Sequence, residues 1–200
     1  MKQLFRTNFK ILMLYAIKVV IAGIIIGLLH EYQLLLVVIL TARIIYRIYN
    51  FKKHKVDNIN IIITGMLITG VIGVTIEYFG TKYGYWEYHD INSQLPHYLL
   101  LVWMLAFSFM YNLERKVFIA SESVTRKQKL YLVLFAVIVY PSLGEIASIN
   151  LGVWTYYFPY KFFGITPHTI VAIAFVHMVI NYAMGQYLKK KNIKDIVLNP

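Results

Sequence analysis

Hydrophobic residues along this chain gather into six long segments, separated by short stretches rich in charged, aromatic and turn-forming residues. The segments lie near residues 11–29, 32–48, 59–79, 97–113, 129–147 and 168–188. Most of them approach the roughly 20 apolar residues that a helix needs to cross a bilayer. The first segment lacks a small-residue cleavage site and is longer than a signal-peptide core, so we interpret it as a span. The pattern predicts an all-α, polytopic membrane protein with about six transmembrane helices.

The composition supports this interpretation. Hydrophobic residues make up 59% of the 200 residues and charged residues only 14%, whereas soluble domains carry about 25% charged residues. The mean hydropathy is +0.60. We therefore expect membrane lipids to surround most of the chain.

The net charge of +11 is explained by where the cationic residues lie. Most of the 20 lysines and arginines lie before the first segment, around the connections that follow the second and fourth segments, or at the C-terminal end: Lys2, Arg6, Lys10, Arg43, Arg47, Lys52, Lys53, Lys55, Arg115, Lys116, Arg126, Lys127, Lys129, Lys189, Lys190, Lys191 and Lys194. The positive-inside rule then places both termini in the cytoplasm and three hairpins on the outer side of a bacterial-type inner membrane. The charge predicts topology and contacts with lipid headgroups, and no nucleic-acid partner.

One pattern of residues occurs twice, each time at the end of an apolar segment. Its members keep the same spacing in both copies: Glu77, Gly84, Trp86 and Tyr88 in the first, and Glu145, Gly152, Trp154 and Tyr156 in the second. A Pro-His pair follows each copy, ending at His97 and His168. The chain has only 3 tryptophans, so coincidence is a weak explanation. The duplication predicts two halves that face one shared site.

The same duplication organises the chain. Residues 1–57 form an N-terminal hairpin without the motif, and residues 58–128 and 129–200 form two units of similar length. Each unit reads as a helix, an outer loop, a second helix and a basic cytoplasmic end. Because the third and fifth spans run in the same direction, we expect two parallel helix-loop-helix repeats within a single membrane domain.

The two glutamates carry the clearest chemistry. Glu77 and Glu145 lie at similar depth near the outer ends of their segments. An ionisable group inside a membrane is costly and usually faces the protein interior or a wet cavity. A carboxylic acid that stays protonated in such a place is suited to act as a general acid. The alternative is a pair of interfacial glutamates that are solvated by headgroups or bonded to a loop.

The repeated aromatic residues also allow two interpretations. Trp86, Tyr88, Trp154 and Tyr156 fit the aromatic belts found at membrane interfaces. Beside an acid, their ring faces would instead stabilise a cation, by roughly 0.5–2 kcal/mol each. An acid within an aromatic wall is what proton-initiated carbocation chemistry on an alkene requires.

The remaining polar residues give weaker signals. The chain has no cysteine, which excludes disulfides, thiol catalysis and cysteine metal sites. His89, Asp90, His97 and His168 lie near the outer surface and offer ligands that suit several metals, but they form no paired metal motif. The sequence therefore assigns no metal and no cofactor. His177 and Asn181 share a helix face deep in the last segment, where we expect a hydrogen bond between helices.

The motif resembles a known family. Glu77-x-x-Gly80-x-x-x-Gly84-x-Trp86-x-Tyr88 with Pro96 and Trp103, and the second copy with Gly164 and Pro167, resemble the carotenoid-biosynthesis membrane proteins that include bacterioruberin-type carotenoid hydratases. The match covers about 77–103 and 145–168. More loosely, the chain is similar to small membrane lycopene cyclases and membrane-bound terpene cyclases, although those lycopene cyclases place paired acids after a proline where this chain has His168.

This resemblance implies an all-helical membrane enzyme that protonates an isoprenoid double bond. Glu77 matches the acidic position of the family, and Glu145 occupies the equivalent place in the second copy. The chain is short for a carotenoid hydratase, so a shorter isoprenoid is as open as a carotenoid.

The sequence thus predicts an integral membrane isoprenoid cyclase or hydratase. Glu77 would be the general acid and Glu145 a second acid/base or an electrostatic stabiliser. The predicted substrate-binding residues are the repeated aromatic and histidine positions: Trp86, Tyr88, Trp154, Tyr156, His97 and His168. A non-enzymatic lipid or solute binder or transporter is the alternative, and a metal-dependent membrane lipid enzyme is a further one. The oligomeric state stays open.

Overall fold

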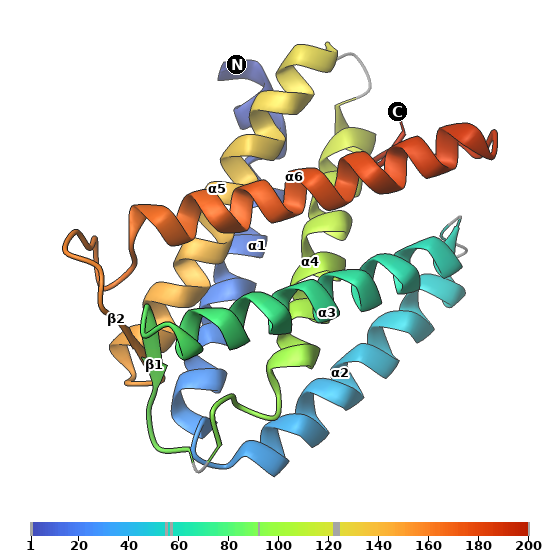
Figure 1. Ribbon diagram of the computed structural model, residues 1–200. Coiled ribbons are helices and arrows are strands. Elements are labelled where there is room, and N and C mark those ends of the chain that lie inside the picture. The colour runs from blue at the N-terminus through green and yellow to red at the C-terminus, as the bar shows by residue number, and fades with distance from the viewer. Residues whose placement is uncertain (1, 55, 57, 92, 122–124, 200) are drawn as a thin grey trace.

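The computed structural model describes residues 2–54, 56, 58–91, 93–121 and 125–199, and it is built almost entirely of helices (Figure 1). The elements follow in the order α1 (Lys2–Leu29), α2 (Gln33–Lys53), α3 (Ile59–Lys82), β1 (Trp86–Tyr88), α4 (Leu99–Ala120), α5 (Arg126–Asn150), β2 (Trp154–Tyr156) and α6 (Pro167–Lys190). Each predicted apolar segment corresponds to one of these helices, although the second and fourth helices begin one and two residues later than predicted.

The helix ends follow from local sequence. Thr125 begins α5 with a capping box, in which its side chain and that of Gln128 each accept a hydrogen bond from the other residue's backbone N–H. Thr166 caps α6 ahead of Pro167, whose ring suits the first helical position. Helices α3 and α5 both end just before a glycine with positive φ, +68° at Gly84 and +84° at Gly152. Because glycine adopts this conformation without steric cost, the chain can turn from each helix into a strand.

Small residues allow the helices to approach closely. Helix α1 packs along α5 and helix α3 packs along α4. Gly23 lies against the backbone of Gly144, and a Cβ atom at Gly23 would come within 2.5 Å of the Gly144 carbonyl oxygen. The Ser148 hydroxyl donates a hydrogen bond across this contact to the Gly23 carbonyl oxygen at 3.2 Å. The α1–α5 pair is therefore a close backbone contact that larger side chains would separate.

Within the described residues, five helices are long and apolar enough to cross a membrane: Asn8–Leu29, Gln33–Lys53, Ile59–Lys82, Lys127–Asn150 and Pro167–Lys190. Helix α4 is not among them because its second half holds Glu114, Arg115 and Lys116. Large apolar side chains cover the outside of the spans, and Val171 and Phe175 on α6 are each 67% exposed. Such a surface fits a lipid environment better than water.

The buried charge on α4 is paired. The Glu114 carboxylate is 3% exposed and lies 2.8 Å from His177 Nε2 on α6. Asn181 lies one turn further along α6 and bonds the same ring nitrogen at 2.9 Å. The expected hydrogen bond between helices therefore forms, with Glu114 as the partner.

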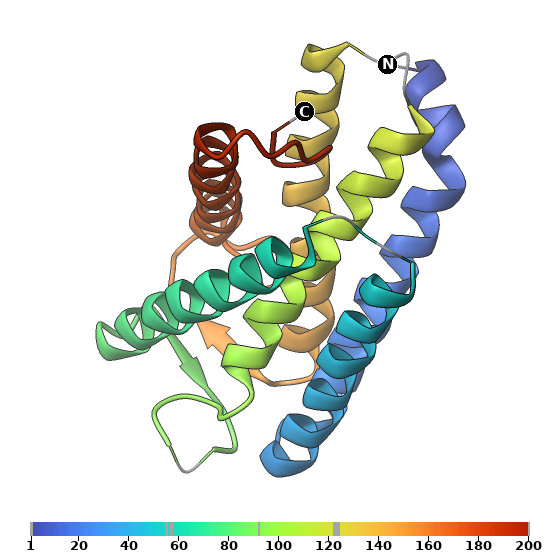
Figure 2. The same ribbon diagram turned by 90° about the vertical axis from the view of Figure 1, so that its right-hand side faces the viewer.

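Both termini lie away from the strands. In Figures 1 and 2 the N and C labels stand toward the top, and the ribbon formed by β1 and β2 lies in the lower half of the molecule. The repeated motif and the chain ends are therefore at opposite ends of the helical bundle.

Candidate functional site

The two copies of the motif meet in the β ribbon. Strands β1 and β2 pair antiparallel, with Trp86 opposite Tyr156, Glu87 opposite Thr155 and Tyr88 opposite Trp154. Across the ribbon the Trp86 and Tyr156 rings lie 5.6 Å apart edge to face, and the Tyr88 and Trp154 rings lie 5.7 Å apart. Aromatic pairs at such distances contribute about 0.5–1.5 kcal/mol beyond the area they bury. The ribbon thus joins segments that are far apart in the sequence.

Glu77 accepts hydrogen bonds from three aromatic side chains. Trp86 Nε1 and the Tyr88 hydroxyl each donate to Oε2 at 2.9 Å, and Trp103 Nε1 donates to Oε1 at 3.3 Å. An ionised carboxylate is an acceptor only and has room for several donors. The surroundings of Glu77 therefore suit a carboxylate.

Two glycines of α3 bring the tryptophans to Glu77. Gly73, Glu77 and Gly80 are spaced by four and three residues, so they lie on one face of the helix. The Trp103 indole lies against Gly73 and the Trp86 indole against Gly80, where any Cβ atom would overlap the rings. The helix therefore presents a carboxylate between two grooves that each hold an indole.

Glu145 has a different environment. The Tyr156 hydroxyl donates to its Oε2 at 2.9 Å, with the same eleven-residue offset that joins Tyr88 to Glu77. Trp154 does not repeat the bond that Trp86 makes, because its buried Nε1 has no hydrogen-bond partner within the described residues. Among those residues one side chain donates a hydrogen bond to Glu145, whereas three donate to Glu77. The two carboxyl groups are matched in sequence and unequal in structure.

The two tyrosines that reach the carboxyl groups are held as hydrogen-bond donors. Burial raises the pKa of Tyr88 well above its usual value, and the nearby Glu77 raises this pKa further. Burial and the neighbouring Glu145 and Glu77 do the same to the pKa of Tyr156. Both phenols therefore stay protonated at neutral and moderately alkaline pH, and both keep an O–H to donate.

Both carboxyl groups line one cavity of about 160 Å³. Its walls come from helices α3, α4, α5 and α6, from both strands of the ribbon and from the segment between β2 and α6. The lining residues are Ile76, Glu77, Trp86, Trp103, Glu145, Tyr156, Phe158, His168, Thr169, Ala172, Ile173 and Val176. The cavity thus combines two acidic groups and several aromatic rings with an apolar face from α6.

The structure brings together five of the eight residues predicted for the site. Glu77, Glu145, Trp86, Tyr156 and His168 line the cavity. The cavity therefore contains both acidic groups and aromatic side chains, the combination that the sequence predicted.

The other three predicted residues lie outside the cavity lining. Tyr88 is buried and bonds Glu77, and Trp154 packs against Tyr88 across the ribbon. His97 is exposed, and its backbone N–H donates to the Gln33 side chain at 2.9 Å. Tyr88 and Trp154 therefore support the cavity wall, whereas His97 stands apart from it.

Two of the aromatic lining residues, Trp103 and Phe158, were not assigned to the site from the sequence. Trp103 appeared only as part of the family resemblance, and its bond to Glu77 spans 26 positions. Phe158 stacks on His168, with ring centroids 4.8 Å apart and an angle of 18° between the planes. The sequence does hold a hint of Trp103. Gly73 lies seven residues before Gly80 on the helix face of Glu77, so this face has a second position without a side chain, where another large ring can pack.

The predicted alternative metal ligands do not gather at the cavity. His89 Nε2 bonds the Thr155 hydroxyl at 2.8 Å, and His168 stacks on Phe158. In the part of the chain that the structure describes, the one group of three potential metal ligands consists of His30, Glu31 and Asp90.

Comparison of the chain with family models, with curated proteins and with solved structures gives no match. The cavity and its residues are therefore the basis for proposing a function.

Proposed function

We propose that this chain is an integral membrane enzyme that modifies an isoprenoid lipid by proton-initiated carbocation chemistry. The observation that carries the proposal is that both copies of the motif line the same cavity, with Glu77 and Trp86 from one and Glu145 and Tyr156 from the other. A purely interfacial role for these residues would not require the two copies to share a cavity.

The hydrogen bonds support distinct roles for the two carboxyl groups. Glu77 has three donors, which suits an ionised group that stabilises positive charge. Glu145 has one donor among the described residues, which leaves more of its carboxyl group available to hold and deliver a proton. We therefore assign the general acid to Glu145 and the electrostatic stabiliser to Glu77, the reverse of the roles expected from the sequence.

The proposed reaction begins when the Glu145 carboxyl group transfers its proton to one carbon of an isoprenoid double bond. A C–H bond forms, the π bond breaks, and a tertiary carbocation remains beside the Glu77 carboxylate. Trp86 and Tyr156 line the cavity, and their aromatic rings would stabilise such a cation by cation–π interaction.

The cation is then consumed in one of two ways. Attack by water forms a C–O bond and releases a proton, whereas attack by an internal double bond forms a C–C bond and ends with loss of a proton from a neighbouring carbon. In either case the proton returns to Glu145 and the cycle closes. His168 and Thr169 are polar lining residues that are suited to hold the attacking water.

The size of the cavity favours reaction at the end of a linear chain. A buried apolar cavity of about 150 Å³ accommodates a ring the size of benzene, which is close to one isoprene unit. A cavity of about 160 Å³ therefore fits a terminal unit, with the rest of the substrate lying outside it. The apolar residues Ala172, Ile173 and Val176 of α6 form the wall against which such a chain would lie.

No observation on the described residues favours transport. A transport path would continue from the carboxyl groups toward Asn112 and Asn181, but neither residue lines the cavity. Asn112 donates to the Tyr15 hydroxyl at 2.6 Å and Asn181 bonds His177. Both asparagines therefore serve contacts between or along helices. With the termini cytoplasmic, as the positive-inside rule implies, the cavity would open toward the outer leaflet.

Mass spectrometry of lipids tests the proposal. Cells that supply linear isoprenoids would express the wild type, Glu145→Gln, Glu77→Gln or Glu87→Gln at equal levels. Glu87 is the matched control, because it is an exposed carboxylate on the same ribbon and does not line the cavity. We expect the wild type and Glu87→Gln to form a product that has gained water or is an isomer of the substrate.

The two cavity variants separate the roles. Glu145→Gln should abolish the product, and Glu77→Gln should reduce it strongly while the substrate still binds. Full turnover by a folded Glu145→Gln protein would refute the assignment of the acid. Lipid profiles that do not differ between the wild type and an empty vector, across a series of isoprenoid chain lengths, would refute the enzymatic proposal.

A further inference from the structure

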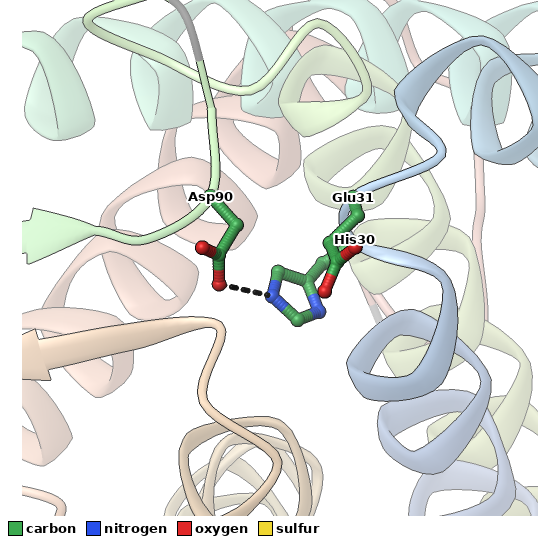
Figure 3. Close-up of side chains that lie close together, drawn as sticks. All are labelled: His30, Glu31 and Asp90. Carbon is green, nitrogen blue, oxygen red and sulfur yellow. Dashed lines mark ion pairs between the residues drawn. The ribbon is translucent and has the colours of Figure 1, made fainter.

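Three potential metal ligands come together where two connections meet. His30 and Glu31 belong to the turn between α1 and α2, and Asp90 lies two residues after β1. One ligand atom from each lies within 4.8 Å of the others. Figure 3 shows the His30 ring and the Asp90 carboxylate pointing toward one another, with Glu31 beside His30. The cluster is distinct from the cavity, because none of its members lines it.

His30 is oriented in the way that a metal-binding histidine is. Its Nδ1 lies 2.7 Å from the Gly27 carbonyl oxygen, and because a carbonyl only accepts, Nδ1 must carry the hydrogen. This bond fixes the ring and leaves the lone pair of Nε2 available, which is the arrangement found around histidine ligands of metals.

The Nε2 nitrogen of His30 is buried and lacks a hydrogen-bond partner, although the Asp90 carboxylate lies within ion-pair distance of it. The residue is only 7% exposed, and Nε2 has no hydrogen-bond partner within the described part of the chain. Asp90 Oδ2 lies 3.5 Å away, which is beyond normal hydrogen-bond length. Leaving a buried polar atom without a hydrogen bond is unfavourable. A cation bound between the His30 ring and the Asp90 carboxylate would remove this desolvation cost.

The separation of the two atoms fits a shared cation. Ligands bound at about 2.0–2.1 Å from a tetrahedral metal lie about 3.4 Å apart, close to the observed 3.5 Å between His30 Nε2 and Asp90 Oδ2. Glu31 and Asp90 are exposed, so the Glu31 side chain can rotate to become a third ligand, with water as the fourth.

We propose that His30, Glu31 and Asp90 form a binding site for a divalent transition-metal ion, with Zn²⁺ as the best match. One imidazole and two carboxylates suit zinc better than magnesium or calcium, which prefer sites made only of oxygen. Negative charge from the two carboxylates compensates the ion. The site would join the α1–α2 turn to the segment that follows β1, and so stabilise the strand that carries Trp86 and Tyr88.

Calorimetry with Zn²⁺ alone tests this site. The full chain would be purified in detergent with a tag that contains no histidine, treated with a chelator, and titrated with zinc chloride. We expect one ion per chain with a dissociation constant in the micromolar range or below, and a higher unfolding temperature when the ion is present.

The variants are chosen so that the fold is retained. Asp90 has a left-handed backbone, with φ of 55°, and asparagine tolerates this conformation well, so Asp90→Asn keeps the loop while removing the charge. We expect Asp90→Asn and Glu31→Gln to weaken Zn²⁺ binding at least tenfold. His54→Gln, which removes an exposed histidine at the end of α2, should leave binding unchanged.

Two results would overturn the inference. One is the absence of stoichiometric Zn²⁺ binding by the folded wild type, which would leave a simple pairing of His30 with Asp90. The other is equal binding by the wild type and Asp90→Asn, which would place the ion elsewhere.

Discussion

The glycine at position 80 offers the most direct test of how the site is built. A Cβ atom at this position would overlap the Trp86 indole, with the outer atoms of the six-membered ring as the nearest neighbours. An indole is rigid and cannot bend away, so Gly80→Ala must displace the whole ring. Displacement breaks the 2.9 Å hydrogen bond from Trp86 Nε1 to Glu77.

The expected cost follows from three terms. Overpacking a well-packed contact costs about 1–3 kcal/mol, and losing a hydrogen bond to a charged group costs about 1.5–3 kcal/mol. Alanine is a better helix former than glycine, and this difference stabilises the folded variant by about 0.5–1 kcal/mol. Gly80→Ala should therefore lower the free energy of unfolding by roughly 2–5 kcal/mol.

Gly70→Ala provides the matched control on the same helix. A Cβ atom there would lie 2.9 Å from Met104 Cγ and 3.0 Å from Leu100 Cδ1, both in flexible side chains, and 3.3 Å from the Leu100 backbone carbonyl oxygen, which is far less close than the overlap with the ring at Gly80. The same gain in helix propensity then meets a smaller steric cost, and we expect a change within about 1 kcal/mol. The contrast between the two variants isolates the indole contact from the effect of alanine itself.

Unfolding in mixed detergent, followed by tryptophan emission, measures both effects. Gly80→Ala should unfold at a lower denaturant fraction than Gly70→Ala, and its folded emission spectrum should shift because Trp86 has left its contact. Equal stability and equal emission for the two variants would refute the packing of Trp86 against α3 and the geometry proposed for Glu77.

Three further predictions concern pH, the buried ion pair and helix packing. Because the folded pKa values of Tyr88 and Tyr156 lie above the unfolded value of 10.0, their stabilising contribution is complete below about pH 10 and is lost as the pH rises through the folded pKa values. Wild-type stability measured from pH 8 to about 12 should therefore fall more steeply than that of the Tyr88→Phe/Tyr156→Phe double variant. Glu114→Ala should cost about 3–5 kcal/mol in thermal unfolding, since it removes the carboxylate partner of His177 and leaves this ring nitrogen with the Asn181 side chain alone, whereas exposed Lys116→Ala should change stability by less than about 1 kcal/mol. Gly23→Leu should separate α1 from α5 and lower the unfolding free energy by at least about 1–3 kcal/mol, while a variant that unfolds as the wild type would contradict the close contact.

The sequence predicted the helices well because their length and apolar composition are local properties. Six segments were expected and each corresponds to one helix to within two residues at its start, although α4 is too charged in its second half to count among the five candidate spans of the described residues. The buried hydrogen bond between Glu114 and His177 explains how α4 accommodates the Glu114 carboxyl group inside the bundle. It joins residues 63 positions apart, a contact that hydropathy does not encode.

The β ribbon was not predicted. Strands β1 and β2 have three residues each, too few for an alternating pattern to be recognised. Their pairing is set by the glycine turns after α3 and α5 and by packing between aromatic rings. The motif was visible in the sequence, but the way in which its copies face one another depends on tertiary structure.

The difference in hydrogen bonding between Glu77 and Glu145 could be predicted only in part from the sequence. The offset from Glu77 to Trp103 leads, in the second copy, from Glu145 to Val171, which has no side-chain donor. The absence of a hydrogen bond from Trp154 to Glu145 could not be predicted, because this tryptophan is present at the expected spacing. Only the fold shows that its Nε1 makes no such bond. The exchange of roles proposed for the two residues depends on this second fact.

The placement of both motif copies on one chain has a consequence for symmetry. Two identical subunits related by a two-fold axis must give both carboxyl groups the same neighbours, so a site of that kind starts with two equivalent acids. In a single chain each copy has its own surroundings, with Trp103 beside one carboxyl group and none in the matching place beside the other. Under the proposed function, this inequivalence would let one cavity hold a proton donor and a negative charge at the same time, and a bound chain would then react in one fixed direction.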